Sequence, residues 1–229
     1  MKAVAVQGID GSARKALLRD RAYFELKSRI LGGQFDQGFL STRSLASDLG
    51  MSLSPVRSAV ERLEHEGFLR IGPQRGILVN DLTIREMTDH FEIREALESL
   101  VVSKLAVGIE GQQIAELREN VRVYERLRER GQIAAFVACD SEFHLLLAAF
   151  AGNAEIERVL GQLRDRIVRT VTRVIRYVPE RMQASIDEHH QIIDLIEQGD
   201  GAKAAEFMKE HLRRGSRTLV PGVAASERE

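Results

Sequence analysis

Cysteine and long apolar runs are scarce in this chain. Cys139 is the only cysteine among 229 residues, so no intramolecular disulfide can form, and the chain suits a reducing compartment such as the cytoplasm. Apolar runs such as Leu145 to Ala151 are far too short to cross a bilayer. Gln7, Gly8 and Asp10 interrupt the apolar segment near the N-terminus. We therefore expect neither a membrane span nor a signal peptide.

The composition that remains is typical of a globular protein. Hydrophobic residues make up 44% and charged residues 29%, which excludes a disordered chain. The net charge of −1 conceals an asymmetry: residues 1–81 hold 12 Lys and Arg against 9 Asp and Glu, and the remainder holds 21 against 25. The N-terminal part is thus better suited to contact nucleic acid than the acidic remainder.

The first third of the chain has the pattern of a winged helix-turn-helix. A helical pattern over 17–31 ends at two glycines, and a short helix follows that begins at Ser41 or Thr42 and stops at Gly50. After a three-residue turn, Ser54 can cap a second short helix, which ends near Gly67. Two β-like pieces around the turn GPQRG complete the motif: FLRI (68–71) and ILVN (77–80).

From Thr83 onward the periodicity is helical, with no β pattern. Thr83 and Glu86 form a capping box that opens a helix running to about Val107. Five further helical segments are expected: 111–130, 133–151, 153–177, 180–198 and 201–216. The predicted fold is mainly α: a winged helix-turn-helix followed by an all-α antiparallel helical bundle. The predicted boundaries are a disordered tail over 1–13, the DNA-binding domain over 14–81, the bundle over 82–217 and a flexible tail over 218–229.

Polar side chains on the helix-turn-helix and at the tip of the ribbon are expected to contact double-stranded DNA. Arg57, near the start of the second short helix, can bind guanine in the major groove with two hydrogen bonds. Arg43 suits a phosphate or a base edge, and Arg75 suits the minor groove or the backbone. Any lone arginine would be read as a solvated surface residue, but the order of the motifs favours DNA binding. The predicted contacts are Arg43, Ser52, Ser54, Arg57, Arg75 and Gly76.

The segment STRSLASDLGMSLSPVRSAVERLEHEGFLRIGPQRGILVN, preceded by LKSRILGGQF, resembles the DNA-binding domain of GntR-type bacterial regulators. The resemblance covers about residues 17–80. This chain departs from the pattern at Gln37, where proline is usual, and at Leu53, where arginine is frequent. The contact made by that arginine is therefore not carried over. Two subunits related by a two-fold axis would read a short inverted repeat.

Asp140 and His144 stand four residues apart in an otherwise apolar helix, so their side chains share one face. Such a pair is more often a surface or core hydrogen bond than a metal site. His189 and His211 lie on later helices, and bundles build metal sites where side chains of several helices meet. Three imidazoles and one carboxylate suit zinc or another first-row divalent ion.

The helical half resembles the FCD domain, the C-terminal domain of FadR-type GntR regulators. The segments that carry the resemblance are FEIREALE, DSEFHLLLAAFAGN, EHHQIIDLIEQGD and AAEFMKEHL. It implies that Asp140, His144, His189 and His211 hold a divalent metal, zinc first, with nickel or manganese as alternatives. His190 competes with His189, since neighbours on a helix point roughly 100° apart and only one can serve. The family spacing favours His189.

The resemblance also implies an effector pocket beside the metal, which we expect to take a small carboxylate. Arg94, Arg169 and Asn153 are the candidate effector residues. Arg94 has a structural alternative, because Glu98 lies one turn on and could pair with it. The arginines at 166, 169, 173 and 176 share a helix face that suits solvent or a subunit contact.

Taken together, the sequence predicts a cytoplasmic, nucleoid-associated homodimeric repressor that binds a metal and an effector and is not an enzyme. One alternative is a metal-dependent hydrolytic enzyme fused to a DNA-binding module, since such a site could activate water. Glu142 lies on the wrong face to serve as its base, and Glu188 points away from His189. An architectural DNA-binding protein is a second alternative, but it would not need a six-helix bundle.

Overall fold

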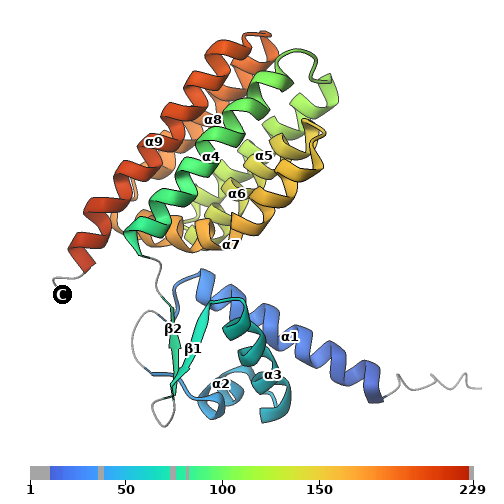
Figure 1. Cartoon of the computed structure of the whole chain (residues 1–229), viewed down its shortest axis with the longest axis vertical. Helices are drawn as coiled ribbons and strands as arrows, with labels where there is room; N and C mark the ends of the chain where they lie inside the picture. The colour runs from blue at the N-terminus through green and yellow to red at the C-terminus, as the bar shows by residue number, and fades with distance from the viewer. Residues whose placement is uncertain (1–10, 36–38, 73–75, 81–82, 227–229) are drawn as a thin grey trace, which may run out of the picture. The chain divides into compact units, whose positions relative to one another are not determined.

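A computed structural model describes residues 11–35, 39–72, 76–80 and 83–226 (Figure 1). The chain divides into two compact units, Met1–Asp81 and Leu82–Glu229.

The first unit is a winged helix-turn-helix, as predicted. Its elements are α1 (Gly11–Leu31), α2 (Thr42–Leu49), α3 (Leu53–His65), β1 (Leu69–Gly72) and β2 (Gly76–Val79). The two strands pair antiparallel, with Leu69 opposite Val79 and Gly72 opposite Gly76. One apolar core joins α1, α2, α3 and the ribbon, and it includes Leu26, Leu45 and Leu63. That core fixes α3 against α1 and leaves the opposite face of α3 exposed.

Local hydrogen bonds set the ends of the two short helices. Ser41 caps α2, because its Oγ accepts a hydrogen bond of 2.9 Å from the Ser44 amide. Gly50 ends α2 with a left-handed backbone (φ 61°) that suits glycine. The third helix begins at Leu53, two residues before the predicted start, with Ser52 rather than Ser54 at the N-cap. Ser54 therefore lies in the first helical turn, where its side chain points outward.

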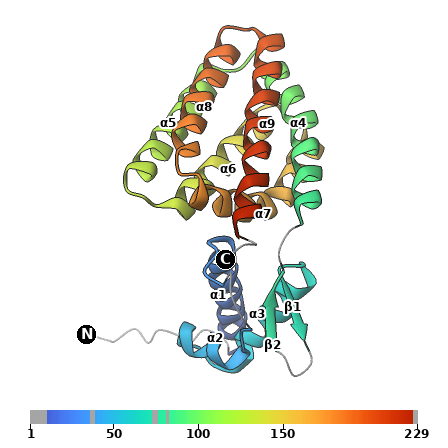
Figure 2. The same cartoon turned by 90° about the vertical axis from the view of Figure 1, so that its left-hand side faces the viewer.

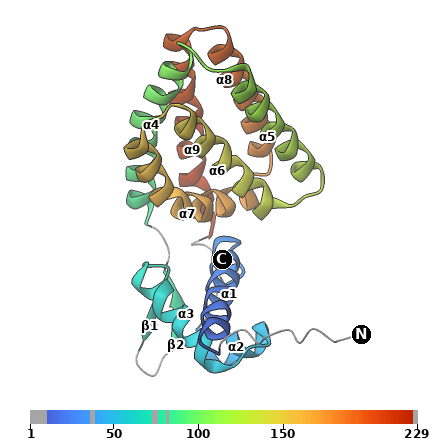
Figure 3. The same ribbon diagram turned by 90° about the vertical axis from the view of Figure 1, so that its right-hand side faces the viewer.

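The second unit is an all-α antiparallel bundle, also as predicted. Its helices are α4 (Ile84–Leu105), α5 (Gly111–Glu129), α6 (Ile133–Phe150), α7 (Ala154–Tyr177), α8 (Arg181–Glu197) and α9 (Gly201–Ser226). Figure 2 shows α9 beside α4 and α8 beside α5, and Figure 3 shows α6 and α7 from the opposite side. The predicted capping box opens α4, since the Thr83 and Glu86 side chains each bond the other residue's amide.

Two helices extend beyond their predicted ends. The α1 helix begins at Gly11, inside the predicted N-terminal tail, and the rest of that tail lies outside the described residues. The α9 helix continues to Ser226 although the sequence predicts a tail from residue 218. Helix growth costs little once a packed nucleus exists, and α9 is anchored along α4.

Within the described residues, α6 is the one helix long and apolar enough to cross a membrane by length and composition. It instead forms part of the core of the bundle, packed against α4, α5 and α7. Its Asp140 and His144 side chains are buried there. The apolar character of α6 is therefore that of a core helix, and it brings a carboxylate and an imidazole inside.

Candidate metal centre and nucleic-acid interface

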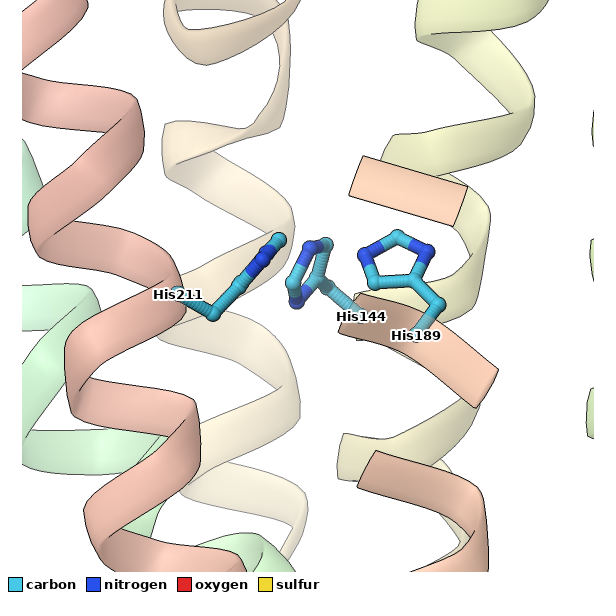
Figure 4. Close-up of side chains that lie close together, drawn as sticks. All are labelled: His144, His189 and His211. Carbon is cyan, nitrogen blue, oxygen red and sulfur yellow. The ribbon is translucent and has the colours of Figure 1, made fainter. Parts of the chain in front are cut away.

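Three histidines from three helices meet inside the bundle. His144 comes from α6, His189 from α8 and His211 from α9, and all three are buried. One ring nitrogen from each lies within 4.8 Å of the other two. Figure 4 shows the three rings pointing toward one another from their separate helices. Residues that are far apart along the chain are thus assembled only by the tertiary fold.

Neither ring nitrogen of His189 has a hydrogen-bond partner among the described residues, although its side chain is completely buried. Burial, together with the nearby His211 and His144, lowers the pKa of His189 well below its usual value. The ring is therefore neutral and offers a lone pair. A buried polar group without a partner costs free energy, and a metal ion is a ligand that such a nitrogen accepts.

A buried carboxylate fixes the ring of His144. The Nδ1–H of His144 donates to Glu98 Oε2 at 2.6 Å, and Arg94 Nε donates to Glu98 Oε1 at 2.6 Å. Burial alone would raise the pKa of Glu98, but Arg94 and His144 lower it to about 2. The charged carboxylate holds Nδ1 protonated and leaves Nε2 for the histidine cluster. Carboxylates in this outer position orient metal-binding histidines.

Glu188 does the same for His211. The Nδ1–H of His211 donates to Glu188 Oε2 at 2.6 Å, and Glu188 also accepts from Arg181 at 2.5 Å and from Arg214 at 3.1 Å. Burial would raise the pKa of Glu188, but these donors lower it to about 2. The sequence interpretation assigned no role to Glu188 or Glu98 in holding histidines. Both carboxylates lie on the buried faces of their helices. A glutamate on the apolar face of a predicted helix was the sequence signal that could have identified them.

Asp140, the predicted fourth ligand, lies beside the three histidines. Its Oδ1 accepts hydrogen bonds from the Tyr124 hydroxyl at 2.7 Å and from the Ser185 hydroxyl at 3.2 Å, and it lies 3.6 Å from His189 Nε2. Oδ2 has no hydrogen-bond partner among the described residues. Tyr124 and Ser185, which sequence reasoning missed, hold the carboxylate in place with Oδ2 available.

His190 lies outside the cluster. Its Nε2 contacts Glu125 Oε1 at 2.9 Å, and its side chain is 38% exposed. The adjacent His189 is fully buried, as expected when neighbours on a helix point in different directions.

A cavity of about 40 Å³ adjoins the histidines. Its volume is several times the about 10–15 Å³ that a single water needs. Arg94 and Arg181, each paired with a buried glutamate, contribute guanidinium groups to a lining that is otherwise partly apolar. The remaining lining residues include Phe91, Tyr124, Asp140, His144, Val171, Ile175, Ser185 and His211.

Two of the predicted effector residues do not line this cavity. Asn153 caps α7 instead, because its Oδ1 accepts from the amides of Glu155 and Ile156, each at 3.2 Å. Asparagine is a preferred capping residue, and this local role accounts for Asn153 without an effector contact. Arg169 lies on α7 but is absent from the lining. Arg181, at the start of α8, lines the cavity instead.

The predicted DNA contacts lie on exposed parts of the first unit. Arg43, Ser52, Ser54 and Arg57 are all exposed on α2 and α3. Arg43 and Arg57 form no ion pair within the described ranges, so their guanidinium groups are available to a ligand. Arg75 lies outside the described residues.

Gly76 has a backbone role. Its φ of 97° is a left-handed conformation, and a Cβ there would lie 2.6 Å from the carbonyl oxygen of Leu40. The close approach allows Leu40 and Ile77 to exchange backbone hydrogen bonds of 2.8 and 2.7 Å. Glycine at this position thus places the wing against the segment that precedes α2.

Comparison with known families gives two matches, one for each unit. Residues 18–79 match the bacterial regulatory proteins of the gntR family, and residues 89–214 match the FCD domain. The chain belongs to the GntR family. This GntR regulator is a DNA-binding transcriptional regulator and not an enzyme, and its FCD domain is the six-helix bundle that holds the histidines. Consistent with that, Glu142, weighed above as a catalytic base, is exposed and pairs with Arg164 at 3.1 Å.

The relatives of this GntR regulator are transcriptional regulators. It is 26% identical over 193 residues to the HTH-type transcriptional regulator YdhC of Bacillus subtilis, covering 83% of this chain and 84% of that protein. It is 27% identical over 182 residues to the HTH-type transcriptional repressor RspR of Escherichia coli, covering 79% and 78%.

Two solved structures share the fold. Escherichia coli McbR/YncC gives a TM-score of 0.73 at 22% identity and covers 88% of this chain and 96% of that one. A GntR regulator from Rhodococcus sp. RHA1 gives 0.74 at 18% identity and covers 89% and 97%. The two-unit architecture is therefore that of the family.

Proposed function

We propose that this regulator is a repressor whose FCD domain binds one divalent metal ion and a small carboxylate effector. The observation that carries the proposal is His189: a neutral, fully buried imidazole with two unpartnered nitrogens, facing two other histidines. A purely structural histidine in a core is normally hydrogen-bonded. The repressor role is supported by the name of the RspR relative.

His144, His189 and His211 would hold the metal, with Asp140 as the fourth ligand through Oδ2. The 4.8 Å bound on the nitrogen separations slightly exceeds twice a zinc–nitrogen distance of about 2.1 Å, so small side-chain movements would suffice. Imidazole and carboxylate ligands suit zinc first, with nickel or manganese as alternatives. A bound ion would supply a Lewis-acidic centre to which an anionic ligand can attach.

The cavity beside the histidines would take the effector. Arg94 and Arg181 line it, and guanidinium groups bind carboxylates with paired hydrogen bonds. Its apolar side, which includes Phe91 and Ile175, favours a compact organic acid over a highly hydrated ion. The volume favours a small molecule. We therefore assign the effector contacts to Arg94 and Arg181.

A homodimer would form through the outer face of α4. Ile93 and Leu100 lie seven residues apart on this face and are 41% and 49% exposed. Val107, 88% exposed, follows in the turn after the helix ends at Leu105 and extends the apolar surface. A second copy that crosses at Leu100 would cover these side chains in both subunits, and use of the same face by both partners is what a two-fold dimer requires. Such a dimer would read an inverted repeat in the cytoplasm, where it would associate with the nucleoid.

The metal assignment can be tested with two neighbouring variants. The protein purified without chelator should contain close to one divalent ion per chain, and His189→Ala should lose it. His190→Ala is the matched control, since it removes an adjacent imidazole that pairs with Glu125 outside the cluster. Elemental analysis of the parent and both variants provides the measurement. Equal metal content in parent and His189→Ala would refute the site.

A further inference from the structure

A hollow of about 410 Å³ lies along the exposed face of α3 and is bordered by α1. Ser54 and Arg57, two of the proposed DNA-reading residues, line it. Among the described residues, the lining is Arg19, Leu53, Ser54, Arg57, Ser58 and Glu61. Of these, Arg19 alone does not belong to α3, and it is not among the DNA contacts predicted from the sequence.

Side-chain contacts between the two helices show why Arg19 lies at this end of α3. Asp20 is 3.7 Å from Arg62, and the Tyr23 hydroxyl and Lys27 ammonium reach Glu66 at 2.7 and 3.2 Å. Residues later in α1 thus meet residues later in α3, so the two helices run in the same sense. Arg19 precedes these residues in α1, and it lines the hollow together with Leu53, Ser54 and Arg57 of the N-terminal half of α3, the end that enters a groove.

Arg19 is exposed and has no ion pair or hydrogen bond within the described ranges. By contrast, Asp20, Lys27 and Arg29 of the same helix all pair with charged residues of the first unit. An arginine that the protein leaves unpaired beside a reading helix keeps its donors for an outside acceptor. Leu53, at the head of α3, is 43% exposed and can offer no donor from its side chain.

We propose that Arg19 binds a phosphate of the DNA backbone beside the groove that α3 enters. The proposal rests on DNA reading by α3. Because Arg19 lies on the neighbouring helix and not on the reading face, its long side chain suits the groove edge, where the phosphates are. Phosphate contacts fix the register of a protein on the duplex and carry no sequence information directly. Arg19 thereby supplies the positive charge that an arginine at position 53 would have supplied.

The test compares Arg19→Ala with Arg21→Ala on a short random-sequence duplex at several salt concentrations. Arg21 is exposed on the same helix but does not line the hollow, so its loss controls for net charge. Each subunit that contacts the duplex loses one phosphate contact, so the slope of log affinity against log salt should fall by about 0.9 per subunit, and binding should weaken roughly fivefold to tenfold per subunit near 0.1 M salt. Arg21→Ala should change the slope by much less. Adding Leu53→Arg to Arg19→Ala should restore both the slope and the affinity.

Identical binding by the Arg19→Ala and Arg21→Ala proteins would overturn the proposal. So would a loss for Arg19→Ala that differs strongly between duplexes of different sequence, because that pattern indicates a base contact. Unchanged thermal unfolding of Arg19→Ala, expected for an exposed side chain, excludes misfolding as the cause. If the parent protein bound no duplex DNA, the proposed function would fail together with this inference. Unchanged binding by Arg19→Ala alone would overturn only this inference.

Discussion

Glu98, which holds a histidine of the proposed site and would not bind the metal itself, is expected to control metal binding. Glu98 holds His144 and neutralises Arg94 in the core, so Glu98→Gln should weaken metal binding about 10- to 100-fold, as loss of an outer-shell partner does. It also leaves a buried arginine without its counter-charge, which should destabilise the fold by about 3–5 kcal/mol. Competition with a metal chelator and thermal unfolding measure the two effects.

The matched control for that variant is Glu95→Gln. Glu95 lies on the same helix and also pairs with an arginine, but Arg213 and Glu95 meet at the surface, 43% and 26% exposed. Surface ion pairs contribute about 0–1 kcal/mol, so this variant should keep its metal and almost all of its stability. Equal chelator competition curves for the two variants would contradict the role given to Glu98.

Glu66 makes the stability of the winged helix depend on pH. Burial would raise the pKa of Glu66, but hydrogen bonds from Tyr23, Lys27 and Arg62 outweigh it and lower the pKa below 4.5. The folded state therefore holds this proton less tightly than the unfolded state. The stabilisation is fully present above the unfolded pKa of 4.5 and is lost as the pH falls through the lower folded value.

Replacing Glu66 by Gln should therefore reduce the acid dependence of stability. Parent and Glu66→Gln proteins should differ in melting temperature at neutral pH and converge as the pH falls through the lowered folded pKa of Glu66, because the parent carboxylate is then protonated. Thermal unfolding followed by circular dichroism across this range provides the measurement. A difference in melting temperature that stays constant at every pH would show that Glu66 acts only through neutral contacts.

At the scale of elements, the wing depends on one glycine. Gly76→Ala would place a Cβ 2.6 Å from the Leu40 carbonyl and would force a left-handed backbone on alanine. The expected cost is about 1–3 kcal/mol, with weaker DNA binding because the wing leaves its position against Leu40. Gly108→Ala is the control, since a Cβ there meets nothing within 4 Å. Thermal unfolding and duplex binding of the two variants decide whether the wing is held as described.

The sequence predicted the elements well because their signals are local. The Thr83–Glu86 capping box, the stop at Gly50 and the helical periodicity after residue 83 each depend on neighbours along the chain. The predicted end of α9 was wrong. The continuation of this helix depends on its packing against α4, and a short stretch of sequence does not reveal that packing.

The site divides in the same way. Local spacing together with family resemblance pointed to His144, His189 and His211, which the fold does bring together. Glu98, Glu188 and Arg181 were missed as parts of the site, because their roles depend on which helices face one another.

At the scale of the whole molecule, the dimer face on α4 is open to a direct test. Leu100→Glu would place a charge at the centre of the proposed two-fold contact, and two such charges would face each other. The variant should be monomeric by analytical ultracentrifugation at concentrations where the parent is dimeric, and it should bind an inverted-repeat operator more weakly.

Ile84→Glu is the control for this face. Ile84 is an exposed apolar residue of the same helix, 41% accessible, but nine positions from Ile93, which places it on roughly the opposite side of α4. It should leave the dimer intact. Dissociation by both substitutions alike would mean that charge on α4 disrupts the protein generally.

The metal, the effector and DNA should be linked through one equilibrium between DNA-binding and DNA-free arrangements. A carboxylate bound between Arg94, Arg181 and the metal would draw together the three helices that carry the histidines, α6, α8 and α9. The α4 helix shares its core with them and follows the wing in the chain. For the effector to release DNA, it must bind the DNA-free arrangement more tightly, and DNA must then weaken effector binding by the same factor. Such couplings are typically about 1–3 kcal/mol.

We expect a small mono- or dicarboxylate that binds the metal-loaded protein and weakens its hold on DNA, with His144→Ala uncoupling the two events. Isothermal calorimetry of a carboxylate panel against metal-loaded protein, metal-stripped protein and the protein–DNA complex measures each leg of the cycle. Affinity should fall on metal removal, because the ion is then missing from the pocket, and should fall again when DNA is bound. An acid that bound all three forms equally well would have no differential free energy with which to shift the equilibrium, and it could not be the effector of this regulator.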